Sequence, residues 1–303
     1  MLKTEFPELK LITISSAKWE ETVNSWIKFI DYEVQDTGYL SKNLVHTWNA
    51  PNNEDSRYAI LTSKKGDQSI GIRIVENLIP TNFEPLRTFG WASVSLLVQN
   101  LDEIISQIKN SPFEIICPIR SINFNQRKIR LLDIRGIGSE VISLAEINDV
   151  NEHNIPFAQC SVDRPFMVTL ATRDIETTKN FYYNKLSIEK VPDIQAEIWP
   201  LSDAFQYNRD TTYALTQSLL GEKNVLEINE YPEDATRRNF ISGNLHPGIC
   251  HITITLPKID ELSLYWLTEP IEIEEGKYKS CKQVTFFGAT GELVELIEHS
   301  SEN

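Results

Sequence analysis

The chain has 303 residues and a mass of 34.8 kDa, and 41% of its residues are hydrophobic and 24% charged. This composition excludes a disordered chain, a collagen-like fibre and a coiled coil, and a chain of this length needs neither a disulfide nor a metal merely to fold. The 43 acidic residues outnumber the 29 basic ones and give a net charge of −14, which disfavours nucleic acid and anionic membrane surfaces as partners.

The sequence also predicts where the chain resides. It has no apolar run of the roughly 20 residues that span a bilayer. Its start, MLKTEFPELKLITI, lacks the long apolar stretch and the cleavage site of a secretory signal. The four cysteines are not arranged in CxxC pairs, which is typical of reduced thiols. We therefore expect a cytoplasmic protein with no membrane partner.

An alternating strand, a polar break and an amphipathic helix follow one another four times along the chain. The four copies are LITISSAKWEETVNSWIKFI (11–30), SVSLLVQNLDEIISQI (93–108), MVTLATRDIETTKNFYYNKL (167–186) and HITITLPKIDELSLYW (251–266). Several strand-like stretches follow each predicted helix, such as SRYAILTS and SIGIRIVE after the first. Each copy is therefore interpreted as a βαβββ module, in a fold of the α+β class.

Local signals support the predicted helices. In the first copy the apolar side chains recur at i, i+4, i+7, i+8 and i+11, which makes one apolar stripe: Trp19, Val23, Trp26, Ile27 and Ile30. In the second copy Asn100 can cap the helix, with Glu103 at the third position of a capping box. Asp174 has the same capping role in the third copy, and Pro257 marks the start of the fourth helix.

The modules begin at Leu11, Ser93, Met167 and His251, so the repeat is roughly 75–85 residues long. This exceeds the period of solenoid repeats and favours small domain halves that pair. The polar stretch EINDVNEHNIPFAQCSVDRP (146–165) is the best boundary. We therefore predict two domains of two modules each, at 1–150 and 151–303.

A tandem of βαβββ modules with this punctuation resembles the vicinal-oxygen-chelate superfamily, which includes glyoxalase I, bleomycin-resistance proteins and extradiol dioxygenases. TLATRDIETTKNFYYNKL, GICHITITLPKID and FFGATGELVELIE carry the resemblance over about 165–300. Over 9–148 it rests on FGWASVSLLVQNLDEI and the order of strands and helices. The resemblance implies curled mixed or antiparallel sheets, each pair of modules enclosing one cleft, and in the metal-dependent members a divalent ion in that cleft.

Strand periodicity predicts which side chains face such a cleft. Alternate residues of a strand point to opposite faces. In HITITL, His251 and Thr253 therefore share one face, while the aliphatic residues between them should pack on the helix. The same parity places Met167, Thr169 and Ala171 on the cleft side of the third module. In NVLEINE and GELVELIE, the embedded acidic residues are Glu227 and Glu295.

The family has four ligand positions per pair of modules, and the resemblance places Met167, Glu227, His251 and Glu295 in them for the 151–303 domain. Glu227, His251 and Glu295 would hold Zn²⁺, Ni²⁺, Mn²⁺, Co²⁺ or Fe²⁺. The set is similar to the Gln, Glu, His, Glu pattern of glyoxalase I. Met167 departs from this pattern, since a thioether is a poor ligand for a hard cation. The fourth ligand position is then vacant, filled by water, or evidence of an inactive site.

In the 1–150 domain the equivalent positions carry Leu11, Arg73, Ser93 and Ser143, which will not hold a divalent cation. Arg73 could supply a positive charge, bind an anionic ligand group, or pair with a carboxylate such as Glu76. This half is therefore interpreted as structural or substrate-shaping.

Three functions follow as hypotheses. The first is a metal-dependent lyase or isomerase, in which Glu295 or Glu227 is the general base for an enediolate-type proton transfer and Met167, Thr169, Thr253 and Arg73 contact the substrate. The second is a metal-free protein that binds or sequesters a small molecule, as bleomycin-resistance proteins do. The third is extradiol-type oxygenation, which needs two histidines where this sequence supplies only His251. Four modules in one chain favour a monomer.

Overall fold

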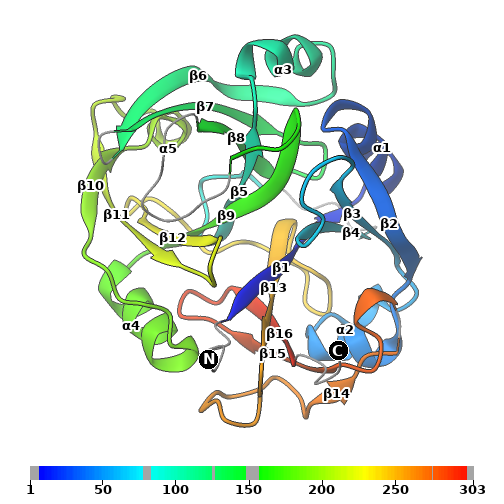
Figure 1. Ribbon diagram of the computed structural model, residues 1–303. Helices are drawn as coiled ribbons and strands as arrows, with labels where there is room; N and C mark the ends of the chain where they lie inside the picture. Colours follow the sequence, from blue (N-terminus) through cyan, green and yellow to red (C-terminus); the bar gives the residue numbers. More distant parts are fainter. Residues whose placement is uncertain (1–6, 78–82, 125–126, 148–156, 275, 299–303) are drawn as a thin grey trace, which may run out of the picture.

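We describe a computed structural model of the chain, for all residues except 1–6, 78–82, 125–126, 148–156, 275 and 299–303 (Figure 1). The four modules are present, in two curled eight-stranded sheets. The first module contains β1 (Glu8–Ser16), α1 (Trp19–Phe29), β2 (Tyr32–Tyr39), α2 (Lys42–Thr47), a 3₁₀ turn (Pro51–Asn53), β3 (Arg57–Ser63) and β4 (Gly71–Glu76). The second contains β5 (Gly90–Val98), α3 (Leu101–Ile108), β6 (Glu114–Phe124), β7 (Arg127–Arg135) and β8 (Val141–Ile147).

The other two modules follow the same order with one exception. The third contains β9 (Val162–Thr172), α4 (Ile175–Leu186), β10 (Ile194–Glu197), α5 (Trp199–Phe205), β11 (Thr212–Leu219) and β12 (Val225–Glu230). The fourth contains β13 (Gly248–Leu256), β14 (Ile271–Glu272), a 3₁₀ turn (Gly276–Tyr278), β15 (Lys282–Phe287) and β16 (Leu293–Glu298). Among the described residues, no helix is long and apolar enough to span a membrane.

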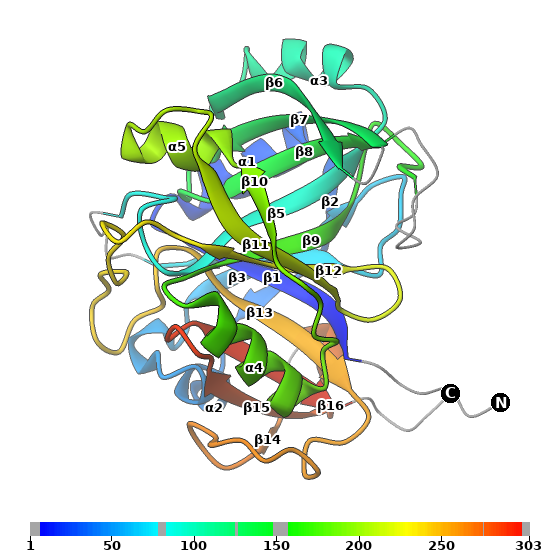
Figure 2. The same ribbon diagram turned by 90° about the vertical axis from the view of Figure 1, so that its left-hand side faces the viewer.

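The modules do not pair as neighbours in the sequence. The first sheet has the order β14-β15-β16-β13-β1-β4-β3-β2 and unites modules one and four, while the second has the order β10-β11-β12-β9-β5-β8-β7-β6 and unites modules two and three. Each joint is antiparallel: β1 pairs with β13, and β5 with β9. Figure 2 shows the two sheets one above the other, with these four strands at the centre.

The expected division into domains 1–150 and 151–303, each with its own pair of modules, is therefore wrong for the sheets, because each sheet takes strands from both halves. The reason is physical. Every module offers the same open edge on its first strand, so hydrophobic periodicity cannot distinguish pairing one-with-two from pairing one-with-four.

The fourth predicted helix is also absent, since residues 257–270 form turns and irregular chain. Ile259 is buried in the core, and the partly buried apolar side chains that follow it, Leu262, Leu264 and Trp266, are spaced by two residues as in extended chain rather than by three or four. Between them Tyr265 is 96% exposed. The other three predicted helices are present as α1, α3 and α4.

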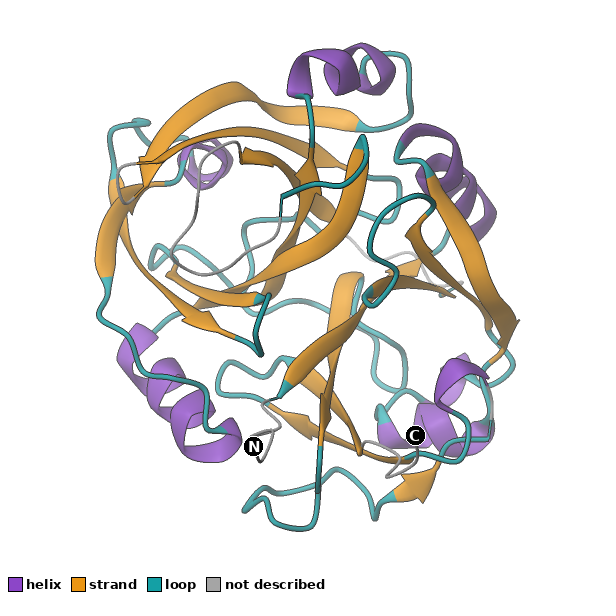
Figure 3. Ribbon diagram, in the orientation of Figure 1, coloured by secondary structure: helices purple, strands orange, loops and turns teal. Residues whose placement is uncertain are grey.

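The strands form the centre of the molecule and the helices lie around them (Figure 3). The largest core cluster contains aliphatic residues from both sheets, such as Ile252 and Val168, together with Trp26 of α1 and Tyr182 of α4. Two short helices that the periodicity did not predict lie beside the concave faces. Leu44 of α2 packs in the first sheet's concavity and Leu201 of α5 in that of the second.

Candidate functional site

The sequence-predicted facings are confirmed in both concave faces. His251 and Glu295 point into the cleft of the first sheet, where their partners are Arg73 and Thr253. Met167, Thr169 and Glu227 line the cleft of the second sheet. Because the two groups belong to different sheets, the predicted set Glu227, His251 and Glu295 does not converge. That metal set is therefore not assembled.

In the first cleft the guanidinium of Arg73 lies between the imidazole and the carboxylate. Its Nη2 is 2.8 Å from His251 Nε2 and 2.7 Å from Glu295 Oε2, and its Nε donates to Thr13 Oγ1 at 3.0 Å. Glu295 also accepts hydrogen bonds from Thr253 Oγ1 at 2.5 Å and from Trp48 Nε1 at 2.8 Å. All six side chains are buried. The group is thus a fully partnered ion pair rather than an open binding site.

Electrostatics agree with this arrangement. Burial and the positive charge of Arg73 lower the pKa of His251 to about 3, so the imidazole is neutral and its Nε2 accepts the hydrogen bond from Arg73. For Glu295, burial acts to raise the pKa, but the charge of Arg73, the neighbouring His251 and the hydrogen bonds from Thr253 and Arg73 together outweigh it and hold the pKa below its ordinary value. Glu295 is therefore an ion-pair partner and not a poised base.

A divalent ion does not fit the described donors. Arg73 already places a positive charge against Glu295 and His251, so a second cation beside them would be repelled. Within the described part of the chain, no three His, Cys, Asp or Glu side chains gather as a metal site would require. The cavity that touches Arg73 measures only about 20 Å³, which is room for a water molecule and far less than the roughly 300–1,000 Å³ of a typical ligand pocket.

The second cleft is open by contrast. Its cavity has a volume of about 170 Å³ and is lined on one side by Ile198, Pro200 and Leu201 of the α5 segment. Apolar side chains of the strands, among them Phe166 and Leu131, cover much of the remainder. An apolar cavity of about 150 Å³ in another protein holds benzene, so this one is large enough for a small organic molecule.

Glu227 is held in this cavity by neutral donors. Gln217 Nε2 donates to its carboxylate at 2.7 Å, Asn229 Nδ2 at 3.0 Å and Thr169 Oγ1 at 3.3 Å. Burial raises its pKa above the ordinary value of a glutamate, although these hydrogen bonds oppose the shift. No positive charge among the described residues forms an ion pair with it. A ligand cation or hydroxyl is the partner that such a carboxyl favours.

An ion pair completes the polar part of this cleft. Arg120 on β6 donates to Asp133 on β7, and the hydroxyl of Ser143 donates to the same carboxylate at 2.5 Å. Sequence reasoning identified Ser143 but missed Arg120 and Asp133. The signal was available, because Asp133 lies directly opposite Ser143 in the register of β7 and β8.

Two buried polar atoms in this cleft have no hydrogen-bond partner within the described chain. They are Ser95 Oγ and Asn229 Oδ1, and both residues line the cavity. Leaving such an atom unpaired costs about 1–3 kcal/mol. Bound water or a ligand that reaches these atoms would remove that cost, which makes the cavity a candidate binding site.

Comparison with known proteins identifies the fold. No protein-family model matches the sequence, and neither does any curated protein. Among solved structures, glyoxalase I from Zea mays has a TM-score of 0.65 at 13% identity and covers 98% of this chain and 94% of its own. A candidate dioxygenase from Bacillus subtilis has a TM-score of 0.61 at 10% identity and covers 96% of this chain and 84% of its own. At these identities the likeness is one of fold.

Proposed function

Because the chain has the vicinal-oxygen-chelate fold, we propose that it binds a small organic ligand in the cleft of the second sheet, without a divalent metal. The observation that carries the proposal is the 170 Å³ cavity with Glu227 and the unpartnered atoms of Ser95 and Asn229 in its lining. The first cleft offers no comparable space. Because only the second cleft has this space, we expect the ligand to bind there and not in the first cleft.

The lining defines the chemistry of the ligand. Glu227, Asn229 Oδ1 and the Asp133 carboxylate are all hydrogen-bond acceptors, and apolar side chains surround them. A complementary ligand has a small apolar or aromatic body and presents donors, with an ammonium group matching Glu227 best. Of the substrate contacts expected from the sequence, Met167 and Thr169 line this cavity, whereas Thr253 and Arg73 belong to the closed first cleft.

Benzylamine and benzyl alcohol test this chemistry by calorimetric titration. We expect Glu227→Gln to weaken benzylamine binding about tenfold or more, because a charged hydrogen bond is lost, and to change benzyl alcohol binding little. Benzylamine affinity should also fall as the pH drops through the raised pKa of Glu227, since the protonated carboxyl cannot pair with an ammonium.

Glu230→Gln is the matched control, because Glu230 lies on the same strand but its carboxylate faces the start of α4. It should leave both affinities unchanged. If neither compound binds, or if benzylamine binds the wild-type protein and Glu227→Gln equally, the proposal is wrong.

The metal-free part of the proposal has its own measurement. Elemental analysis of untagged protein should find far less than one equivalent of transition metal, and Zn²⁺, Ni²⁺, Mn²⁺ or Fe²⁺ should not raise the thermal midpoint. A resident metal would stabilise the fold by about 3 kcal/mol at a hundred times its dissociation constant. One equivalent of metal that is lost in His251→Ala and Glu295→Ala would refute this part and favour the lyase or isomerase hypothesis.

A further inference from the structure

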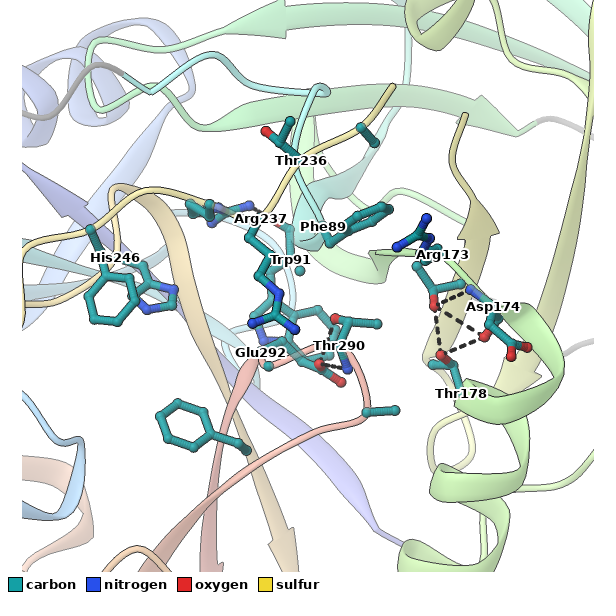
Figure 4. A pocket seen from close by; sticks show the side chains of 18 of the residues that line it. Phe89, Trp91, Arg173, Asp174, Thr178, Thr236, Arg237, His246, Thr290 and Glu292 are labelled. Atoms are coloured by element: carbon teal, nitrogen blue, oxygen red, sulfur yellow. Dashed lines mark hydrogen bonds between the residues drawn. The ribbon is translucent and has the colours of Figure 1, made fainter. Parts of the chain in front are cut away.

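A larger pocket lies where the two sheets meet, outside both concave clefts (Figure 4). Four segments line it: the start of β5, the start of α4, the connector between β12 and β13, and the turn between β15 and β16. Its volume is about 760 Å³, within the range of about 300–1,000 Å³ typical of ligand pockets. We name it the inter-sheet pocket.

Two exposed arginines in this pocket have no partner within the described chain. Arg173 precedes α4 and Arg237 lies in the connector, and neither makes a hydrogen bond or ion pair with a described residue. Figure 4 shows Arg237 extending into the pocket, with Phe89 between it and Arg173 in this view. Other arginines of the molecule do find carboxylates, as Arg57 does with Glu76. Two unpaired guanidinium groups in one pocket are notable in a chain of net charge −14.

A third arginine is buried in the pocket wall. Arg238 donates to the backbone carbonyls of Trp91 and Ile249, each at 2.6 Å, and to Pro247 O at 3.2 Å. Burial lowers its pKa to about 10, so it remains charged at neutral pH. No carboxylate in the described structure pairs with it. Since buried charges are normally paired, Arg238 gives the pocket an uncompensated positive charge.

The two acidic residues of the lining do not neutralise these arginines. Asp174 caps α4, where its carboxylate accepts from Thr177 N at 2.9 Å and Thr177 Oγ1 at 2.7 Å. Glu292 accepts from Tyr182 Oη at 2.6 Å and from Thr290. Burial raises the pKa of Glu292 and so favours its uncharged form. Asp174 keeps its charge, but three arginines face these two carboxyls in the lining, so the inter-sheet pocket has a net positive charge.

Aromatic side chains supply the rest of its surface. Phe240 and Phe287 are 44% and 39% exposed, and Phe89 is half-buried. His246 stacks on Phe240 with ring centroids 4.1 Å apart, and burial together with Arg238 lowers its pKa to about 4, so that it is neutral. Exposed aromatic faces beside guanidinium groups are complementary to a flat apolar body that carries an anionic group.

We infer that the inter-sheet pocket is a second ligand site, which takes an aromatic anion such as a phosphate monoester of an aromatic alcohol or an aromatic carboxylate. Arg173 and Arg237 bind the anionic group, Arg238 supports it through its charge, and Phe240 and Phe287 contact the ring. This site is separate from the cleft of Glu227, which favours donor-bearing ligands.

Phenyl phosphate, benzoate, inorganic phosphate and benzyl alcohol are the probes, titrated by calorimetry. Phenyl phosphate or benzoate should bind with one site per chain and more tightly than inorganic phosphate. The two aromatic anions distinguish phosphate from carboxylate as the preferred group. Arg237→Met and Arg173→Met should each weaken this binding about tenfold, because each removes a charge-assisted hydrogen bond. Phe240→Ala should weaken the aromatic anions but not inorganic phosphate.

Arg135→Met is the matched control, because it removes an exposed arginine of β7 that pairs with Glu114 and does not line the pocket. It should leave the affinities unchanged, and so should Glu227→Gln. The inference is overturned if neither aromatic anion binds at millimolar concentration, or if Arg135→Met weakens binding as much as Arg237→Met. Loss of benzylamine binding alone would overturn the proposed function and not this site.

Discussion

The most informative residue is Arg73, because its charge decides what the first cleft can hold. The alternation of side chains along a strand predicted correctly that His251 and Glu295 face the cleft. It could not predict that an arginine 178 positions from His251 would lie between them, since that contact depends on which modules pair. Sequence periodicity therefore predicted which side chains face the clefts, but not which residues they contact there.

Removing Arg73 should be more damaging than removing the whole ion pair. In Arg73→Met, Glu295 remains buried without its counter-ion, and we expect a loss of about 3–5 kcal/mol in the free energy of unfolding. The double variant Arg73→Met with Glu295→Gln should recover much of that loss. Urea denaturation of both variants measures the effect, and equal stabilities would contradict it.

Glu140 provides a pH-dependent prediction. It is fully buried, Oε1 accepts from Trp26 Nε1 at 2.8 Å, and Oε2 has no partner within the described chain. Burial raises its pKa from 4.5 to about 7. Between these values the folded state binds more protons than the unfolded state, so this group's contribution to stability is present at low pH and is lost as pH rises toward 7.

Glu140→Gln should therefore stabilise the protein at pH 8 and have little effect at pH 4, because glutamine keeps an acceptor for Trp26 without a charge. The gain is on the order of 1–3 kcal/mol, at about 1.4 kcal/mol per pKa unit. Denaturation followed by tryptophan fluorescence at both pH values measures it. If Glu140→Gln destabilises the protein equally at pH 4 and pH 8, the prediction that Glu140 has a raised pKa is wrong.

At the scale of elements, capping was the most predictable feature. Asn100 was expected to cap the second module's helix, and its Oδ1 accepts from Asp102 N at 2.9 Å while its Nδ2 donates to Glu103 at 2.9 Å. The prediction of a fourth helix was wrong because a short apolar run with two-residue spacing was interpreted as helical. Neighbouring residues determine whether a side chain caps a helix, whereas tertiary packing determines whether a short segment becomes helical.

The cap of α3 has a measurable effect. Asn100→Ala should lower the free energy of unfolding by about 1 kcal/mol, since two backbone N–H groups lose their acceptor. Asn100→Asp keeps a side-chain acceptor and should retain most of the stability. Thermal unfolding of the two variants is the measurement, and an equal loss in both would assign the effect to something other than capping.

Two turns of matching geometry connect the sheets. Gly136 N donates to Glu140 O at 2.9 Å, and Gly288 N donates to Glu292 O at 2.7 Å. Each turn presents its glutamate to a helix of the neighbouring module in the sequence, Glu140 to Trp26 of α1 and Glu292 to Tyr182 of α4. The modules that do not share a sheet are thus joined through a buried carboxyl.

At the scale of the molecule, the pairing of modules one with four and two with three makes the halves of the chain interdependent. Fragments 1–150 and 151–303 should each fail to fold alone, because each lacks the β1–β13 and β5–β9 joints. We expect no cooperative unfolding transition from either fragment by circular dichroism. Mixing them should restore one. A cooperative transition in one isolated fragment would favour the domain division expected from the sequence.

The same pairing has a consequence for synthesis on the ribosome. β1 emerges with one edge unpaired, and its partner β13 begins only at Gly248, when most of the chain has been translated. At about 5–20 residues per second the first module, which ends at Glu76, waits roughly 10–35 s for that partner. The inner sheet of modules two and three can close during this interval. The fourth module therefore completes the sheet that the first module begins.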